Sequence, residues 1–524
     1  MNRRDFIKSA AMSLTVLTPG SAFGGRDRRT KRLSCSKPNI VFLLADDLAY
    51  KDLSAYGQKA RRTPNLDRLA LGGVRFTQAY AGASMCAPSR AVLMTGLHLG
   101  HCRIRNNRSV RGGQEYLLDE DVTVAEVLKQ AGYRTAMVGK WGIGLPTTEG
   151  VPDKQGFDLA YGFYDQQRAH GYYPDYMMHN GTKEPLEQNH GFNMTRMYQY
   201  GRTPLSKMAP ETHNTYDDQG RLIPDGIADP GRAVNSQDLI HAKALEFIRE
   251  NKNHPFFLYY ATQIPHGPII AKELGRFRDK SWDIKHKEWA AMIDHLDRHV
   301  GELVTCLQES DLLDNTIIFF ASDNGYEPSY LNNKRYEDDP VFQYKGPWPG
   351  GKFSNREGGL RVPFFVYWKG RINPRLSDHI TVFYDFLPTA ADLAGVSLTS
   401  ATDGISIVPE LENRLEEQCK HEFLYWEHDN TIHAQAVRMD RWHAFRPHPN
   451  KAMELYDIVS DPECKENLAS NQPDIVKRIE RIMDKAHTPS KWFINPGESR
   501  ERIAAKKERA KSHPMPQGRR ANGI

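Results

Sequence analysis

Apolar residues gather along this chain into short runs, and each run ends abruptly at charged or polar side chains. Four largely apolar segments of strand length lie at residues 38–45, 133–139, 255–261 and 314–322, the last of which begins with a turn. Largely apolar runs of this length are typical of strands buried on both faces of a parallel sheet. Segments 59–71, 122–132 and 289–310 read as amphipathic helices instead. This alternation predicts an α/β fold in which helices sandwich a large mixed, mostly parallel sheet.

The pattern changes after about residue 397. Residues 421–446 read as antiparallel strands, and a helix is expected over 472–487. We therefore predict a large domain over 36–397 and a smaller C-terminal α+β domain with an antiparallel sheet over 398–490. Residues 491–524 are rich in Lys and Arg, with Gly and Pro late in the segment, which predicts a disordered basic tail. A tail that grips polyanions is the alternative.

The charge of the chain is concentrated at its two ends. The formal net charge is +5, but residues 1–32 carry +6 and residues 498–524 carry +5, which leaves −6 on the body of the 524-residue chain. A basic body that would favour nucleic acid is therefore absent, and we expect no nucleic-acid partner. Hydrophobic residues at 39% and charged residues at 26% are typical of a globular protein large enough for two domains.

The first 25 residues resemble a twin-arginine signal peptide. Arg3 and Arg4 precede a mildly apolar run over 10–17, which is too short to cross a bilayer permanently. Small residues near position 22 offer a cleavage site, and no later stretch is apolar enough to be transmembrane. The interpretation is an exported protein, periplasmic or extracellular. A disordered basic N-terminus is the alternative.

Cysteine usage excludes two common roles. The six cysteines lie at 35, 86, 102, 306, 419 and 464, widely spread and without a C-x-x-C pair. This spacing indicates neither a disulfide framework nor a zinc site, although a single bridge stays open.

Polar side chains follow each of the four apolar runs. Because carboxyl ends of parallel strands meet at one crevice of an open sheet, we expect these side chains to converge there. Three carboxylates and one amide form an all-oxygen shell, which suits Ca²⁺ or Mg²⁺ better than Zn²⁺. An exposed turn is the alternative for the first acidic pair. The residues, in chain order, are Asp46 and Asp47, Lys140, His266, and Asp323 with Asn324.

The stretch 84–96 has an unusual local design. Cys86 opens a predicted helix, with Pro88 and Ser89 in the first turn and Arg90 one turn on. The helix N-terminus offers free N–H groups, and the Arg90 guanidinium can reach back over the same position. This arrangement favours an anionic or strongly polar group at position 86. A buried structural cysteine beside a capping serine is the bland alternative.

The stretch C-x-P-S-R resembles the signature of type I sulfatases, members of the alkaline phosphatase-like superfamily. In that family this Cys is converted after translation to formylglycine (3-oxoalanine) by a formylglycine-generating enzyme. Further motifs in family order include Thr-Pro-Asn-Leu-Asp after position 62, Gly-Lys-Trp at 139–141, and Ser-Asp-Asn-Gly at 322–325. The resemblance covers about 36–487. One departure is clear: Gly142 stands where the family pattern Gly-Lys-Trp-His has a His that contacts formylglycine, as in a bacterial arylsulfatase-like subtype.

The resemblance implies a covalent mechanism for sulfate ester hydrolysis. The aldehyde at position 86 hydrates to a gem-diol that attacks sulfur, and the remaining hydroxyl lets sulfate leave. Ca²⁺, favoured over Mg²⁺, would be held by Asp46, Asp47, Asp323, Asn324 and an oxygen of the modified Cys86. The remaining implied roles are the base for Asp323, orientation of the diol for Arg90, sulfate binding for Lys140 and Lys352, and protonation of the leaving alcohol for His266.

The substrate implied is a sulfated carbohydrate or an aryl sulfate. Residues 145–235 are rich in Gly, Pro, Asn and aromatic residues, which predicts a loop rim around the site. His170 in this rim, with Arg105 and Asn107 upstream, are candidate substrate-binding residues, and a galactose-type sugar is the narrower hypothesis. Two alternatives remain: a phosphonate or phosphate monoester hydrolase of the same superfamily, and a catalytically silent protein that binds sulfated glycans.

Overall fold

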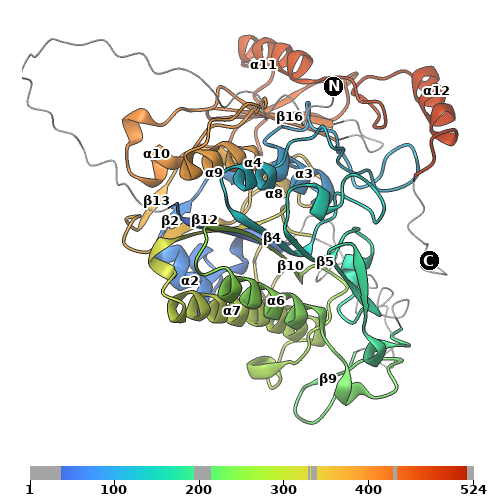
Figure 1. Cartoon of the computed structure of the whole chain (residues 1–524). Helices are drawn as coiled ribbons and strands as arrows, with labels where there is room; N and C mark the ends of the chain where they lie inside the picture. The colour runs from blue at the N-terminus through green and yellow to red at the C-terminus, as the bar shows by residue number, and fades with distance from the viewer. Residues whose placement is uncertain (1–36, 194–213, 328–330, 332–338, 429–433, 516–524) are drawn as a thin grey trace, which may run out of the picture. The chain divides into compact units, whose positions relative to one another are not determined.

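The computed structural model describes residues 37–193, 214–327, 331, 339–428 and 434–515 (Figure 1). The predicted signal peptide, residues 1–25, lies outside this described part, as does Cys35. The other five cysteines, Cys86, Cys102, Cys306, Cys419 and Cys464, are free thiols.

One ten-stranded sheet organises the larger part of the chain. Its central strands pair in parallel, and antiparallel strands flank them on both sides. The predicted mixed, mostly parallel sheet is therefore confirmed. In spatial order the strands are β13 (Arg375–Ser377), β2 (Val74–Phe76), β12 (Phe364–Trp368), β11 (Thr316–Ser322), β1 (Asn39–Asp46), β10 (Phe256–Pro265), β4 (Arg134–Lys140), β5 (Leu159–Phe163), β6 (Tyr176–His179) and β7 (Thr182–Pro185).

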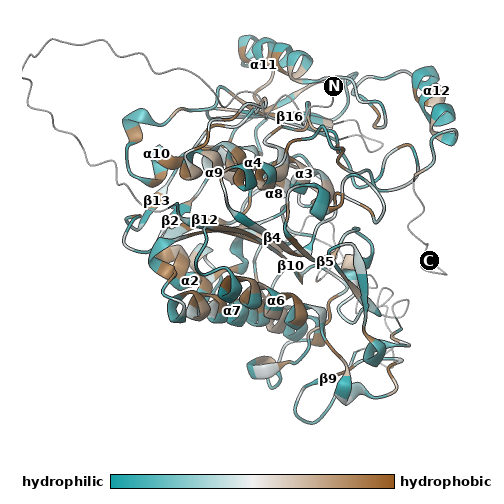
Figure 2. Ribbon diagram, viewed as in Figure 1, coloured by the Kyte–Doolittle hydropathy of each residue, from teal (hydrophilic) through white to brown (hydrophobic). Residues whose placement is uncertain are grey.

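The four predicted apolar runs form the centre of this sheet. Strands β1, β10 and β11 are buried at every position, and β4 is buried after Arg134. A strand in this position has no face toward water, which explains why its sequence runs apolar without alternation. Figure 2 shows these strands as the hydrophobic layer between the helices.

Helices cover both faces of the sheet (Figure 1). Each layer buries an apolar stripe against the sheet, so the sheet separates two hydrophobic cores. On one side lie α2 (Pro64–Leu71), α6 (Ser236–Glu250) and α7 (Ile284–Glu309). On the other lie α3 (Cys86–Thr95), α4 (Val124–Gln130), α8 (Glu357–Leu360), α9 (Phe386–Ala394) and α10 (Val408–Leu411).

The C-terminal part forms its own antiparallel sheet, as predicted. The order is β15 (Leu424–His428), β16 (Ala434–Met439), β17 (Trp442–Arg446) and β18 (Glu454–Asp457), and α11 (Pro473–Ala486) packs on β16. Trp426 attaches this sheet to the segment that leads into α3, because its indole N–H donates to Ala81 O at 3.0 Å.

Two sequence expectations need correction. The prediction of a disordered tail over 491–524 is wrong for α12 (Arg500–Lys511), which Ser499 caps and Lys506 docks. The Lys506 ammonium donates to Ser490 O and Phe493 O and pairs with Glu498, so a basic segment gains a specific attachment. The predicted loop rim over 145–235 also contains β5, β6 and β7.

Strand β5 escaped detection because it pairs with β4 through glycine. Gly139 and Gly162 are register partners, and a Cβ on Gly162 would lie 2.0 Å from Gly139 O. Only glycine allows this close approach, and a glycine inside a five-residue strand weakens its prediction although the other four residues are apolar.

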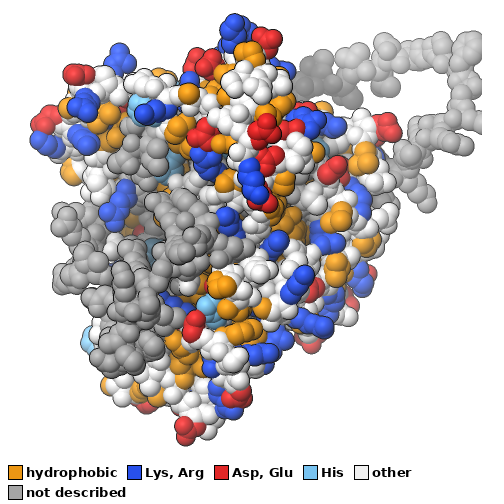
Figure 3. Space-filling view, turned by 180° about the vertical axis from the view of Figure 1, so that it is seen from behind, with side chains coloured by type: hydrophobic (Ala, Val, Ile, Leu, Met, Phe, Trp, Pro, Cys, Tyr) orange, Lys and Arg blue, Asp and Glu red, His pale blue; other side chains and the backbone are white. Residues whose placement is uncertain are grey.

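Within the described part, no helix combines the length and apolar character needed to cross a membrane. In Figure 3, Lys and Arg side chains alternate with Asp and Glu over the described surface of that face.

A histidine at the start of α7 makes the free energy of unfolding depend on pH. His286 Nδ1 lies 2.6 Å from Asp283 Oδ2, and its Nε2 lies 2.8 Å from Asp339 Oδ2. Burial alone would lower the pKa of His286, but the two carboxylates outweigh it and raise the pKa to about 9. Because this value exceeds the unfolded value of about 6.5, the stabilisation is complete below that pH and is lost as the pH rises through 9.

We expect the free energy of unfolding to fall between pH 6.5 and 9, with a smaller fall in His286→Gln. Urea unfolding at a series of pH values measures both slopes. Equal slopes in the two proteins would show that His286 carries no such linkage.

Candidate active site

The carboxyl ends of β1, β4, β10 and β11 meet at one edge of the sheet. Asp46 is the register partner of Pro265, directly before His266, and Ala45 is the partner of Ser322, directly before Asp323. Lys140 ends β4, which pairs in parallel with β10. The structure thus brings together the four polar clusters that the sequence places at strand ends, in the crevice typical of open α/β sheets.

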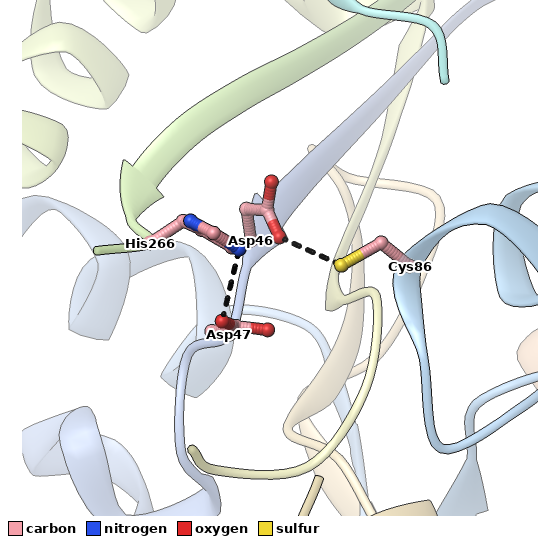
Figure 4. A group of neighbouring side chains, drawn as sticks. All are labelled: Asp46, Asp47, Cys86 and His266. Atoms are coloured by element: carbon pink, nitrogen blue, oxygen red, sulfur yellow. Dashed lines mark hydrogen bonds and ion pairs between the residues drawn. The ribbon is translucent and has the colours of Figure 1, made fainter. Parts of the chain in front are cut away.

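Cys86 faces this edge from the first residue of α3. Its thiol donates to Asp46 Oδ1 at 3.5 Å (Figure 4). Two side chains fix the start of the helix: Ser89 Oγ accepts from Gly82 N at 3.1 Å, and Asn107 Oδ1 accepts from Ala87 N at 3.1 Å. The first turn of α3 therefore holds residue 86 rigidly against the end of β1.

Arg90 joins the helix to two carboxylates. Its Nε and Nη2 donate to Asp323 Oδ2 at 3.1 and 2.9 Å, and Nη2 lies 3.4 Å from Asp46 Oδ2. Nη1 donates to Lys140 O at 2.7 Å. The guanidinium is fully buried, so these contacts fix the relative positions of α3, β4 and the end of β11.

Two lysine ammonium groups flank the acidic centre. Lys140 Nζ donates to Asp46 Oδ2 at 2.6 Å, and Lys352 Nζ donates to Asp47 Oδ2 at 2.7 Å. The loop that carries Lys352 is tied to the segment before α3, because Phe353 N donates to Ser84 O at 2.8 Å. Both lysines are buried and therefore have fixed positions, as an anion-binding site requires.

His266 and His170 form a stacked pair beside Lys352. Their ring centroids lie 4.3 Å apart with planes at 11°. His266 Nδ1 donates to Gly267 O at 2.5 Å, so Nε2 faces the site, 3.3 Å from Lys352 Nζ and 3.5 Å from Asp47 Oδ2. Tyr172 fixes the backbone here by donating to His266 O at 2.8 Å. His170, a predicted substrate residue, thus reaches the site through His266.

The buried charges shift one another's pKa values in different directions. Burial and Asp46 raise the pKa of Asp323 to about 7, whereas Lys140 and His266 overcome burial to hold the pKa of Asp46 well below its usual range. Burial, with Asp323 and Asp46, raises the pKa of the Cys86 thiol well above its usual value. Burial and Lys352 lower the pKa of His266 to about 4. Residue 86, as cysteine, is therefore a protonated thiol and a weak nucleophile at neutral pH.

The donor set fits a divalent cation. Asp46, Asp47, Cys86 and His266 each place one ligand atom within 4.8 Å of the others (Figure 4). Asn324 Oδ1 is buried and accepts no hydrogen bond from the described part of the chain, while its Nδ2 donates to Asp47 Oδ1 at 2.8 Å. A buried acceptor without a donor is the arrangement expected of a metal ligand.

Asp323 lies at the same centre but in a different role in this structure. Its Oδ1 accepts from Asp47 N at 3.1 Å, which the left-handed backbone of Asp47 (φ 65°) makes possible. Strain of this kind in a non-glycine residue costs of the order of 1–3 kcal/mol and collects at functional sites. His266, which the sequence did not suggest as a ligand, stands among the four clustered side chains instead.

Gln166 is the residue that sequence reasoning missed. Gly142 has φ +78°, and a Cβ there would lie 2.4 Å from Gln166 Nε2 and 3.6 Å from Arg90 Cδ. Gln166 Nε2 also donates to Gly142 O at 3.2 Å. The side-chain amide of Gln166 therefore occupies the space beside Arg90 that a side chain at 142 would need. No local signal marks this residue, which lies 24 positions along the chain.

Gly142→Ala is expected to lower both the melting temperature and the turnover. The left-handed backbone alone costs about 1–2 kcal/mol for a residue with a Cβ, and the clash displaces Gln166. Adding Gln166→Ala to Gly142→Ala should recover the stability that the clash with Gln166 costs. The cost of the left-handed backbone at position 142 should remain. Thermal unfolding and aryl sulfate turnover of the two single variants and the double variant measure the coupling, and strictly additive losses would contradict it.

Arg105 does not belong to the site, so its prediction as a substrate-binding residue is wrong. Its guanidinium is buried and donates to Glu427 Oε1 at 2.7 Å, to Gly100 O at 2.9 Å and to Cys102 O at 3.0 Å. These contacts attach the loop after α3 to β15. Asn107 does lie beside Cys86, but its side-chain oxygen is used by the helix start, as described above.

Comparisons with known proteins agree with this geometry. The family described as Sulfatase matches residues 38–396, and the family described as N-sulphoglucosamine sulphohydrolase, C-terminal, matches residues 351–488. N-acetylgalactosamine-6-O-sulfatase of Bacteroides thetaiotaomicron is 30% identical over 494 residues, covering 86% of this chain and 93% of that protein. Arylsulfatase A of Homo sapiens is 31% identical, covering 84% of this chain and 80% of that protein.

Solved structures share the whole fold. The crystal structure of Ps i-CgsB in complex with k-i-k-neocarrahexaose superposes with a TM-score of 0.69 at 27% identity, covering 92% of this chain and 98% of that chain. The phosphonate monoester hydrolase of Agrobacterium radiobacter, at 18% identity and a TM-score of 0.60, shares the fold, with 86% of this chain and 95% of that chain covered. On the family match and the extent of the relatives, this chain is a type I sulfatase of the alkaline phosphatase-like superfamily, an enzyme that hydrolyses sulfuric esters.

Proposed function

We propose that this sulfatase releases sulfate from sulfated carbohydrates, with formylglycine at position 86 and Ca²⁺ at the acidic centre, after export by its twin-arginine segment. The observation that carries the proposal is the convergence of Cys86 with two buried lysines and three carboxylates at one sheet edge. Two fixed ammonium groups beside a rigidly held residue 86 suit a sulfate group at that place. Residues 36–397 would form the catalytic domain, and residues 398–490 a C-terminal subdomain.

Each group would supply a distinct part of the chemistry. Formylglycine would provide a hydrated aldehyde as the nucleophile, made by a formylglycine-generating enzyme. Ca²⁺, when bound to Asp46, Asp47, Asp323 and Asn324, would neutralise carboxylate charge and polarise sulfate oxygens; Mg²⁺ is the weaker candidate.

The chain's own residues would orient the substrate and move the proton. Arg90 would hold the nucleophile in line, and Lys140 and Lys352 would bind sulfate oxygens. His266 Nε2 points toward Lys352 and Asp47 and would deliver a proton to the leaving alcohol. Because the pKa of His266 is lowered by burial and by Lys352, an anionic substrate beside Lys352 would favour the protonated ring.

Relatives support a sugar substrate and leave the ring position open. One relative is named for N-acetylgalactosamine-6-O-sulfate chemistry, and one similar structure holds k-i-k-neocarrahexaose. We therefore favour a galactose-type sugar. The stacked His170 would contact the ring next to the leaving oxygen.

Two measurements test the proposal. Mass spectrometry of the peptide that contains Cys86, from a host able to mature sulfatases, should show an aldehyde. Release of sulfate from sulfated galactosides and from a matched aryl sulfate should exceed phosphate release from the corresponding aryl phosphate and phosphonate esters. Faster phosphate or phosphonate release would favour the hydrolase alternative. Glycan binding without any release from aldehyde-bearing protein would favour the silent binding protein.

His170→Ala is expected to reduce turnover of sulfated galactosides more than turnover of an aryl sulfate, because an aryl sulfate presents no sugar ring to the rim. Arg168→Ala is the matched control, since Arg168 lies in the same turn but pairs with Asp175 and stacks on Tyr176. Initial rates on both substrates give the ratio. An equal loss on both would instead indicate that His170 acts through the stacked His266.

A further inference from the structure

A second cluster of metal-ligating side chains lies in the other helical layer, between α6 and α7. Asp238 stands in the first turn of α6, and His295 and His299 stand one turn apart on α7. Each of the three offers one ligand atom within 4.8 Å of the others. Both histidines are buried, while the Asp238 side chain is 34% exposed and opens the cluster to solvent.

The spacing of the ligand atoms fits a tetrahedral ion. Asp238 Oδ1 lies 2.9 Å from His295 Nε2 and 3.6 Å from His299 Nε2. Ligands bound at about 2.0–2.1 Å with tetrahedral angles lie about 3.3 Å apart. The two observed separations bracket that value, so binding would need only small side-chain adjustments.

The hydrogen bonds around His299 suit a ring that binds metal through Nε2. Glu302 Oε2 only accepts, so His241 Nε2, 2.9 Å away, carries the proton and His241 Nδ1 can accept. The Tyr260 hydroxyl lies 3.3 Å from His241 Nδ1 and 3.4 Å from His299 Nδ1. When Tyr260 donates to His241, its oxygen can accept from His299 Nδ1–H, which is the tautomer that metal binding through Nε2 requires.

Two imidazole nitrogens that face one carboxylate oxygen can bind a cation, which displaces the protons between them. Metal-bound histidines donate their other N–H to an oxygen, and Tyr260 offers that oxygen to His299 Nδ1. The second oxygen of Asp238 is held by Lys272 Nζ at 2.5 Å, which orients the carboxylate and leaves Oδ1 for the ion.

We propose that Asp238, His295 and His299 bind a divalent transition metal ion, Zn²⁺ by preference, with water in the fourth position. Two imidazoles and one carboxylate favour Zn²⁺ over the hard cations that suit the catalytic centre. The ion would clip α6 to α7 and stabilise the helical layer. Its ligands lie on α6 and α7, and none of them is among the residues of the catalytic centre described above.

A third cluster of possible metal ligands is less suited to an ion than the cluster between α6 and α7. His98, His101 and Asp403 also lie within ligand distance. However, His98 Nδ1 accepts from Gly100 N at 3.1 Å. A histidine that binds metal through Nε2 keeps its proton on Nδ1 and donates it, so His98 would have to give up this backbone hydrogen bond.

The test uses the full chain without a polyhistidine tag, saturated with Ca²⁺. Titration with Zn²⁺ should show one additional bound ion by elemental analysis and a raised melting temperature. Co²⁺ should give the visible absorption of a tetrahedral nitrogen and oxygen site. Asp238→Asn and His295→Gln should each weaken Zn²⁺ binding by about tenfold or more and remove the stabilisation. Asp238→Asn changes a partly exposed side chain, so folding is preserved, which circular dichroism checks.

His286→Gln is the matched control. His286 lies on the same helix, but both of its ring nitrogens face carboxylates, so it offers no lone pair. Zn²⁺ binding should persist in His286→Gln, and also in Asp323→Asn, where the catalytic centre is disrupted. The proposal is overturned if the wild type takes up no ion beyond the catalytic centre, or if Asp238→Asn and His295→Gln bind Zn²⁺ as the wild type does.

Discussion

Cys86→Ala is expected to abolish sulfate release, by on the order of 10⁴-fold or more, while the fold stays intact. The side chain is 1% exposed, and its thiol donates a hydrogen bond of 3.5 Å to Asp46. Its removal should therefore cost only about 1 kcal/mol of stability. Lys140, Lys352 and Arg90 keep their partners, so substrate binding should survive the loss of turnover.

Aryl sulfate turnover and thermal unfolding measure the two effects separately. Cys306→Ala, a buried cysteine on α7 in the other core, controls for the loss of a core thiol and should keep full activity. Retention of turnover in Cys86→Ala would contradict a nucleophile at this position. Binding of a substrate by the inactive variant would show that the ammonium pair is still in place.

Asp323→Asn is expected to lose both the catalytic metal and activity. The carboxylate is the main partner of the buried Arg90 and accepts from Asp47 N. Asparagine keeps the shape and the acceptor for Asp47, but it removes the charge that Arg90 pairs with. Breaking a buried ion pair in this way costs about 3–5 kcal/mol, and the charge that remains disfavours a cation nearby.

Elemental analysis of bound metal, melting temperature and turnover report the outcome. Asp385→Asn is the control for stability, since Asp385 is also buried but accepts from Val382 N and pairs with His421, away from the catalytic centre. We expect that control to lose stability and to retain metal. Full metal content in Asp323→Asn would remove Asp323 from the ligand set.

The sequence predicts those parts of the fold in which the hydrophobic pattern of a segment matches its burial in the folded protein. Strands β1, β4, β10 and β11 are buried on both faces, so their apolar runs are readable, and parallel pairing then brings Asp46, Lys140, His266 and Asp323 to one edge. Strand β5 carries glycine at the close contact with β4, and α12 is a basic segment attached by Lys506. The apolar run of β5 is only five residues long and is interrupted by its glycine, and α12 has no apolar stripe to detect.

Site residues were missed or misplaced where long-range contacts decide their role. Arg105 stands in a polar segment near Cys86, but its partner Glu427 is 322 positions away, and nothing local indicates that pair. Gln166 fills the space beside Gly142 only because β5 returns the chain there. The sequence shows which side chains can bind an anion or fill a space. Which other residue each of them contacts is determined only by the folded chain.

The burial of α3 determines when an enzyme could reach residue 86. All ten residues from Cys86 to Thr95 are buried, and the C-x-P-S-R stretch has no face toward solvent. An enzyme that modifies residue 86 must therefore meet the nascent or unfolded chain. If residue 86 matures as proposed, modification and folding would compete in time, and a chain that folds first would keep an unmodified, buried cysteine and stay inactive. The fraction of active enzyme in a given host would then depend on the rate of modification relative to the rate of folding.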